Sequence, residues 1–180
     1  MKIFTSTPQL ILRELIPADA AGMFELDSDE AVHLYLGNNP VKTIAESSAV
    51  IEMIRQQYKD NGIGRWAVIE KETNHFVGWA GLKLIKEPVN GHVNYYDVGY
   101  RFIKRYWGKG YATECAIASL AYGFNELKAD QLFAMTDAGN AASRRVLEKV
   151  GFMQNGTFYE DGILHNWFEI SKDKWLLSHS

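Results

Sequence analysis

The chain of 180 residues contains a single cysteine, Cys115, and only four prolines. One cysteine cannot form an intrachain disulfide, so the fold does not depend on an oxidising compartment. No apolar run approaches the roughly 20 residues that span a bilayer. The N-terminal segment has neither a continuous apolar region nor a small-residue cleavage site. We therefore expect a cytoplasmic protein that makes no use of a membrane.

An excess of basic residues is also missing. The chain has 19 lysines and arginines against 22 aspartates and glutamates, a formal net charge of −3. A protein whose main partner is nucleic acid needs a basic surface to neutralise phosphates, so we expect no nucleic-acid partner. The five histidines have no metal-ligand spacing among themselves or with Cys115, so no metal is expected either; they are His33, His75, His92, His165 and His179.

The composition that remains is that of one globular domain. Apolar residues make up 47% of the chain and charged residues 23%, which is ordinary for such a domain. There is no internal repeat, no low-complexity tract and no linker rich in proline, glycine and serine. We therefore predict a single domain over residues 1–180.

Local patterns predict a mixed α/β (α+β) fold, because strands follow one another in the middle of the chain and alternate with helices towards its end. The predicted strands cover residues 10–15, 65–70, 76–85, 93–103 and 131–136, followed by a hairpin over 158–170. The predicted helices begin at Pro17 and then cover residues 29–36, 43–61, 110–126 and 141–150.

The most informative stretch is residues 97–112, DVGYRFIKRYWGKGYA. A strand runs into Gly108 and Gly110, where a helix begins. Glycine removes the Cβ obstruction, so backbone N–H groups can close on an anion at the positive end of the helix. Arg105 and Lys109 add full charges. These features predict a phosphate cradle, best suited to a pyrophosphate; the alternative is a tight turn that needs glycine for its geometry alone.

Two familiar phosphate motifs fit this stretch poorly. A dinucleotide-binding G-x-G-x-x-G would need glycine where Thr113 stands. A P-loop would need serine or threonine directly after Lys109. A dinucleotide-binding module therefore stays as a weaker alternative.

Two helices near this stretch have their own signals. In the helix after the turn, small residues on one face predict close packing on a sheet, and large apolar residues on another predict core; they are Ala112, Ala116, Ser119 and Gly123, and Ile117, Leu120, Phe124 and Leu127. In the helix over 141–150, Asn140 fits an N-cap and Gly151 a C′ glycine.

These residues together resemble the GCN5-related N-acetyltransferase (GNAT) family. The stretch Arg105-x-x-Gly108-x-Gly110-Tyr111-Ala112 resembles its pyrophosphate motif, and Asn140-x-x-Ser143-x-x-x-Leu147-Glu148-Lys149-x-Gly151-Phe152 resembles its second motif. The strand Asp97-Val98-Gly99-Tyr100 resembles the family's acidic-x-Gly-Tyr strand. The residues of these motifs are most similar to those of the RimJ/RimL type, which acetylates the N-termini of ribosomal proteins. The order of the predicted elements from Leu10 to Trp175 is similar to that of the family.

The resemblance implies a twisted, mostly antiparallel sheet of about seven strands, with helices on both faces and central strands that splay. The pantetheine arm of acetyl-CoA would enter between those strands. The residues that would bind acetyl-CoA are the backbone of Tyr100, Phe102 and Ile103, the turn of Arg105, Trp107, Gly108, Lys109, Gly110, Tyr111 and Ala112 for the pyrophosphate, and Asn140 and Ser143 at the thiol end.

The implied reaction is direct transfer of acetyl from acetyl-CoA to a primary amine, which must be neutral to attack. An α-amino group, with a pKa of about 7.7–8.0, needs only a modest base, whereas a lysine or polyamine amine near about 10.4 needs more help. Asp97 is the candidate that accepts this proton through water. Leu147 occupies the position where many relatives have a proton-donating tyrosine, so the resemblance to the RimJ/RimL type makes Ser143 the candidate donor. Nothing marks Cys115 as a nucleophile.

The acceptor implied by the resemblance is a protein or peptide N-terminal amine. A small-molecule amine, such as an amino acid, a polyamine or an antibiotic, is the alternative within the same chemistry. A non-catalytic acyl-CoA sensor is the alternative that Leu147 keeps open. Tyr159 and Glu160 are expected in the wall of the acceptor groove. We expect Tyr95, Tyr96 and Trp167 to be exposed, in that groove or at a dimer edge, and both monomer and homodimer remain open.

Overall fold

The computed structural model describes residues 1–178, so that His179 lies outside the described residues. The chain forms one eight-stranded sheet of order β1-β2-β3-β4-β5-β6-β8-β7. The strands are β1 (Ile3–Ser6), β2 (Leu10–Arg13), β3 (Trp66–Glu70), β4 (Phe76–Ile85), β5 (Tyr95–Phe102), β6 (Gln131–Asp137), β7 (Met153–Glu160) and β8 (Ile163–Ser171).

Every neighbouring pair in this sheet is antiparallel except β5 and β6, which are parallel. The prediction of a mixed, mostly antiparallel sheet is confirmed, but the sheet has eight strands rather than about seven. The additional strand is β1, a four-residue edge strand whose Ile3 is 55% exposed. So short a segment carries almost no alternating pattern, and its pairing with β2 comes from the turn between them.

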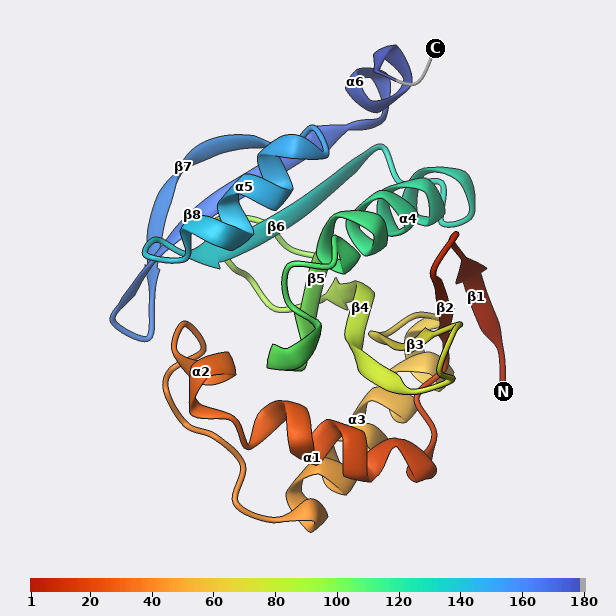
Figure 1. Ribbon diagram of the computed structural model, residues 1–180. Helices are drawn as coiled ribbons and strands as arrows, with labels where there is room; N and C mark the ends of the chain where they lie inside the picture. The colour runs from red at the N-terminus through yellow and green to blue at the C-terminus, as the bar shows by residue number, and fades with distance from the viewer. Residues whose placement is uncertain (179–180) are drawn as a thin grey trace.

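Helices cover both faces of the sheet, as expected (Figure 1). The helices α1 (Ala20–Asp27), α2 (Glu30–His33) and α3 (Ile44–Asn61) lie on one side, and α4 (Tyr111–Asn125) and α5 (Ala141–Lys149) on the other. Pro17 opens a 3₁₀ turn, η1 (Pro17–Asp19), that leads into α1. A second 3₁₀ turn, η2 (Lys104–Tyr106), follows β5, and α6 (Lys172–Leu177), which the sequence patterns did not predict, begins at the cap Ser171.

The predicted helix boundaries agree with local capping chemistry. Thr43 caps α3 in a reciprocal arrangement with Glu46, and Gly62, with φ of 70°, ends that helix. The Oδ1 atom of Asn140 accepts the Ser143 N–H at 3.1 Å, which confirms the N-cap of α5. Gly151, with φ of 104°, follows α5 in the left-handed region that a C′ residue adopts.

Helix α4 packs closely on the sheet through its small residues. A Cβ at Gly123 would lie 2.7 Å from Leu132 Cδ1 on β6, and Ala116 and Ser119 are fully buried. The prediction of a small-residue contact face is therefore confirmed. The neighbouring apolar stripe is only partly core, because Ile117 is 46% exposed. The stripe is wider than the sheet surface that α4 covers, so its outer edge faces solvent.

A second, smaller core lies on the face of the sheet opposite α4, over β5, β6 and β8. Tyr95, Phe133 and Trp167 form it, and the His92 ring stacks on Trp167 with centroids 4.9 Å apart. The expectation that Tyr95 and Trp167 are exposed is wrong, since they are 7% and 1% exposed. The connection between β4 and β5 brings His92 back over these rings, which no local pattern indicates.

None of the helices within residues 1–178 combines the length and the apolar character that crossing a bilayer requires.

The contact between α4 and β6 can be tested by enlarging Gly123. We expect Gly123→Val to lower the free energy of unfolding by about 1–3 kcal/mol, because the side chain would overlap Leu132. Urea denaturation measures this change. Ala49→Val on the exposed face of α3 is the matched control and should shift the stability by no more than about 0.5 kcal/mol; equal effects of the two substitutions would contradict the packing account.

Candidate functional site

The central feature of the sheet is that β5 and β6 hardly pair. Their ladder contains one residue pair, Asp97 with Phe133. By contrast, β5 pairs with β4 from Gly78↔Phe102 to Ile85↔Tyr95. Beyond Asp97, β5 therefore runs on to Phe102 without a partner on its β6 side, and the two strands separate as the resemblance implied.

The backbone of β5 offers fewer groups at this edge than expected. The Ile103 N–H donates to Val77 O at 3.0 Å, and the Ile103 C=O accepts the Tyr106 N–H at 2.9 Å. Both backbone groups of Ile103 thus already have partners inside the fold, and its pairing with the pantetheine arm stays a prediction. Because successive residues of a strand direct their backbone groups to opposite edges, Tyr100 and Phe102 face β6. The Phe102 C=O already accepts the Trp107 Nε1–H at 2.8 Å.

The turn between β5 and α4 presents free amides. Gly108 and Gly110 have φ of 77° and 83°, the left-handed region that favours glycine, and a Cβ at either would meet open space. Within residues 1–178, no acceptor takes the N–H of Gly108, Lys109 or Gly110. Gly110 is also the N-cap of α4, a helix of 15 residues whose first amides have no intrahelical acceptor. An anion is favoured at such a helix N-terminus.

The two cations of this turn are engaged elsewhere. Arg105 forms an ion pair with Glu25 on α1. The Lys109 ammonium lies 3.2 Å from Glu70 Oε1 and 4.9 Å from the centroid of the Tyr106 ring. Arg105 and Lys109, which the sequence predicts beside a phosphate, therefore each already pair with a carboxylate. The attraction for an anion comes first from the backbone amides and the dipole of α4.

Glu70, at the end of β3, was not singled out by the sequence and joins three segments. Its buried carboxylate accepts Thr73 Oγ1 at 2.6 Å, the Tyr111 hydroxyl, and Lys109 Nζ. The hydrogen bonds from Thr73 and Tyr111, with Lys109 beside them, lower the pKa of Glu70 to about 2. Glu70 thereby holds the first residue of α4 and the preceding lysine against β3. Tyr111 turns its side chain to this interior contact, and the next residue, Ala112, is partly buried against the core.

The first turn of α5 contacts β5 directly. The Tyr100 hydroxyl donates to Ser143 O at 3.2 Å and lies 3.1 Å from Ser143 Oγ. Burial raises the pKa of Tyr100 to about 12, so its phenol is neutral near pH 7. The structure thus brings together two of the residues singled out from the sequence. Leu147, on the same helix, is 1% exposed and belongs to the core.

Asp97 lies at the junction where β5 leaves β6, on the other face of β5 from Tyr100, since strand side chains alternate. Its carboxylate Oδ2 pairs with Arg65 Nη2. Burial raises the pKa of Asp97, and the opposing effect of Arg65 is smaller. Asp97 and Ser143, the two groups singled out for proton transfer, therefore lie on opposite faces of β5, with Ser143 held beside Tyr100. Their roles in proton transfer stay a prediction.

Other residues singled out from the sequence have plainer environments. Cys115 is fully buried, and burial raises the pKa of its thiol, so the nucleophilic thiolate is disfavoured. Tyr159 is 73% exposed on β7. Glu160 is close enough to Tyr95 that its charge, together with that of Asp97, raises the pKa of this phenol, although burial raises it more. In the part of the chain that the structure describes, no three His, Cys, Asp or Glu side chains gather as metal ligands.

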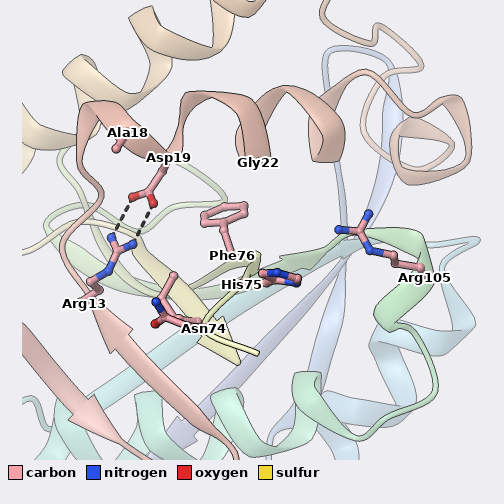
Figure 2. A pocket seen from close by; sticks show the side chains of 9 residues that line it. Arg13, Ala18, Asp19, Gly22, Asn74, His75, Phe76 and Arg105 are labelled. Carbon is pink, nitrogen blue, oxygen red and sulfur yellow. Dashed lines mark hydrogen bonds and ion pairs between the residues drawn. The ribbon is translucent and has the colours of Figure 1, made fainter. Parts of the chain in front are cut away.

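A cavity of about 380 Å³ lies elsewhere, between the start of α1 and the turn from β3 to β4 (Figure 2). Arg13 and Arg105 line it, but Asp19 holds Arg13 through two hydrogen bonds of 2.8 Å and Glu25 holds Arg105. Its charges are thus compensated, and it lies away from the junction of β5 and β6. Neither Asp97 nor Ser143, the residues singled out for proton transfer, lines this cavity.

Comparisons with known proteins agree with this geometry. The family described as the acetyltransferase (GNAT) domain matches residues 9–153. The protein YkkB of Bacillus subtilis is 31% identical over 153 residues, which cover 84% of this chain and 86% of YkkB. The putative ribosomal N-acetyltransferase YdaF of the same organism is 25% identical over 177 residues, 92% of this chain and 93% of YdaF.

Solved structures share the whole fold. The GNAT-family acetyltransferase of Bacillus anthracis has a TM-score of 0.78 and 27% identity, covering 96% of this chain and 99% of its own. The spermidine N-acetyltransferase of Vibrio cholerae, solved in complex with CoA and spermine, has a TM-score of 0.74 and 20% identity, covering 93% and 98%. At that identity, the second likeness speaks for the fold alone.

The role of Glu70 in holding the turn predicts a stability that depends on acid pH. Because folding lowers the pKa of Glu70 from 4.5 to about 2, its contribution is complete above about pH 4.5 and is lost as the pH falls towards 2. Glu70→Gln should lose about 2 kcal/mol near pH 7, the worth of a hydrogen bond to a charged group. Urea denaturation at pH 7, 4.5 and 3 measures this difference, which should be nearly the same at pH 7 and 4.5 and clearly smaller at pH 3; a difference that is constant with pH would contradict the assignment.

Proposed function

The chain belongs to the GNAT family of acetyltransferases, and from that premise we propose that it transfers the acetyl group of acetyl-CoA to the α-amino group of a protein or peptide, as the RimJ/RimL type does. Residues 1–180 would act as one cytoplasmic catalytic domain. The observation that carries the proposal is the unpaired edge of β5 beyond Asp97, which leads directly to the free amides at the start of α4. An extended arm ending in a pyrophosphate matches both features.

The residues at the junction divide the work of the reaction. The amides of Gly108 to Gly110 and the N-terminus of α4 would hold the pyrophosphate, and Tyr100 and Phe102 would align the pantetheine arm. Asp97 would take the proton of the attacking amine through a water molecule while the nitrogen bonds to the thioester carbon. A backbone N–H of β5 would meet the developing oxyanion. As the carbon–sulfur bond breaks, Ser143 Oγ would donate a proton to the sulfur and regain one from water.

Two features support an α-amine over a polyamine as acceptor. The acidic residues at the end of α1 are engaged: Arg105 holds Glu25, Arg101 holds Asp27 at 2.6 Å, and Asp29 caps α2 through the Ala31 N–H at 2.8 Å. Few carboxylates there remain free to attract a polycation. In addition, the pairing with Arg65 opposes the rise in pKa that burial causes at Asp97, so this carboxylate remains a modest base. A modest base suits an amine with a pKa of about 7.7–8.0 better than one near about 10.4.

The cradle is tested by calorimetric titration of the purified chain with acetyl-CoA. We expect saturable binding at one site, weakened about tenfold or more, equivalent to 1.4 kcal/mol, in Gly108→Val and Gly110→Val, because valine is strained at positive φ and disturbs the amides. Gly62→Val is the matched control, since Gly62 has a similar φ of 70° and equally open surroundings and ends α3, on the other side of the sheet from α4 (Figure 1). No binding by the unaltered chain would refute the cradle.

The reaction is tested by acetyl transfer to peptides with free N-termini, with spermidine and free amino acids as competing acceptors. Peptide acetylation should be preferred, and Asp97→Asn or Ser143→Ala should each lower kcat by about 10²-fold with little change in acetyl-CoA affinity. A preference for spermidine would contradict the proposed α-amine acceptor and favour a polyamine instead. Acetyl-CoA binding without transfer to any amine would favour a sensor, and a double variant that keeps activity within a few-fold would refute the two roles.

A further inference from the structure

Arg65 contacts both the side chain and the backbone of Asp97, although no sequence motif singles out this arginine. Its Nη2 pairs with Asp97 Oδ2, and its Nη1 donates to the backbone oxygen of Asp97 at 2.7 Å. The same Nη1 donates to Gly81 O on β4 at 2.6 Å. The two side chains are 11% and 15% exposed. The guanidinium thus reaches from the start of β3 across β4 to β5 and fixes both the strand and the carboxylate.

Gly99 on β5 leaves the space that the side chain of Arg65 occupies. A Cβ at Gly99 would lie 2.7 Å from Arg65 Nη2 and 2.8 Å from its Cζ. Any other residue at this position would displace the guanidinium from Asp97. The spacing Asp97-x-Gly99 therefore has a physical reason in this chain: the glycine clears the route by which the arginine reaches the aspartate.

A second arginine lies near this pair. The guanidiniums of Arg65 and Arg101 lie 5.3 and 4.9 Å from the Trp79 ring. Arg101 has its own carboxylate, Asp27, at 2.6 Å. The two arginines thus share one indole, but each pairs with its own acidic residue. Arg101 also supplies a control of the same chemistry on the same strand.

We propose that Arg65 is a positioning residue for the proton-transfer step: it holds Asp97 by Oδ2 at the junction of β5 and β6, so that Oδ1 is the oxygen that receives the amine proton. This inference rests on the proposed function. In the balanced step, the nitrogen–carbon bond forms while one ammonium-type proton passes through water to Asp97 Oδ1. The proton leaves Asp97 for solvent after acetyl transfer, and Arg65 stays protonated throughout.

The charged and titratable groups that face Asp97 set the direction of the effect. Arg65 and Lys83, which lies opposite Asp97 on β4, both favour the carboxylate. Tyr95 is a buried phenol whose own pKa is raised, mainly by burial, so it carries no charge near pH 7. Without Arg65, burial is opposed by Lys83 alone and the pKa of Asp97 rises. The carboxylate is then both less available and less well oriented.

The test is a double-mutant cycle on the full chain, with acetyl-CoA and a peptide amine at saturation. Arg65→Gln should lower kcat about tenfold or more while the KM for acetyl-CoA stays within about twofold, because orientation and not cofactor binding is lost. Arg65→Gln in the Asp97→Asn background should cost nothing further. Arg101→Gln is the matched control, and its effect should simply multiply with that of Asp97→Asn.

Two further measurements separate positioning from general support of the fold. The acid limb of the kcat–pH profile should move to higher pH in Arg65→Gln, because the pKa of Asp97 rises, and should not move in Arg101→Gln. The amine substrate titrates identically in all variants, so a difference between their profiles reports on Asp97. Arg65→Lys, which keeps the charge but not the fork of donors, should restore part of kcat and serves if the glutamine variant fails to fold. The inference would be overturned if the losses of kcat in Arg65→Gln and Asp97→Asn multiplied in the double variant, or if the acid limb of the Arg65→Gln profile stayed where it is in the unaltered chain. If the unaltered chain transfers acetyl to no amine, the proposed function fails and this role fails with it, a result distinct from normal transfer that is insensitive to Arg65.

Discussion

The organisation of this protein depends on the point where two parallel strands stop pairing. A backbone edge in the middle of a sheet is normally satisfied by the neighbouring strand, because unpaired buried N–H and C=O groups are costly. Here β5 and β6 share the single pair Asp97↔Phe133 and then separate. The strands remain in place because β4 pairs along the length of β5, and β8 along the length of β6. The edge that opens between them is therefore rigid, and the turn of Gly108 and Gly110, the start of α5 and the carboxylate of Asp97 all lie around it.

The electrostatics of the site follow a consistent rule of local compensation. Arg105, Lys109, Arg65 and Arg101 are paired with Glu25, Glu70, Asp97 and Asp27, respectively. Pairs of this kind contribute little net attraction for a distant ligand, but they hold segments from different parts of the chain in register. In the proposed cradle, recognition of the pyrophosphate would then be left to backbone amides, whose direction is set by the turn. Such a site selects by geometry more than by charge.

The two faces of β5 have different chemistry. On the side of α5, the neutral phenol of Tyr100 and the hydroxyl of Ser143 form a hydrogen-bonded pair. On the side of α1, Asp97, Arg65, Trp79 and Arg101 form a row of charged groups around an indole. The proposed reaction, in which an amine arrives from one side and a thiol leaves on the other, would use such a division directly. Burial of Cys115 removes the one thiol of the chain from that chemistry.

The sequence by itself determined the features that depend on neighbouring residues. The strand, turn and helix around Gly108 and Gly110, the Asn140 cap and the mixed α/β class were all predictable, because caps and turns are set within a few positions of the chain. Sequence patterns could not indicate that Ile103 is satisfied within the fold or that Tyr95 and Trp167 are covered. Arg65 and Asp97 are 32 positions apart, and Glu70 and Tyr111 are 41 positions apart. Only the tertiary structure decided these pairings, because strand register, which no local pattern encodes, brings such distant side chains to one place.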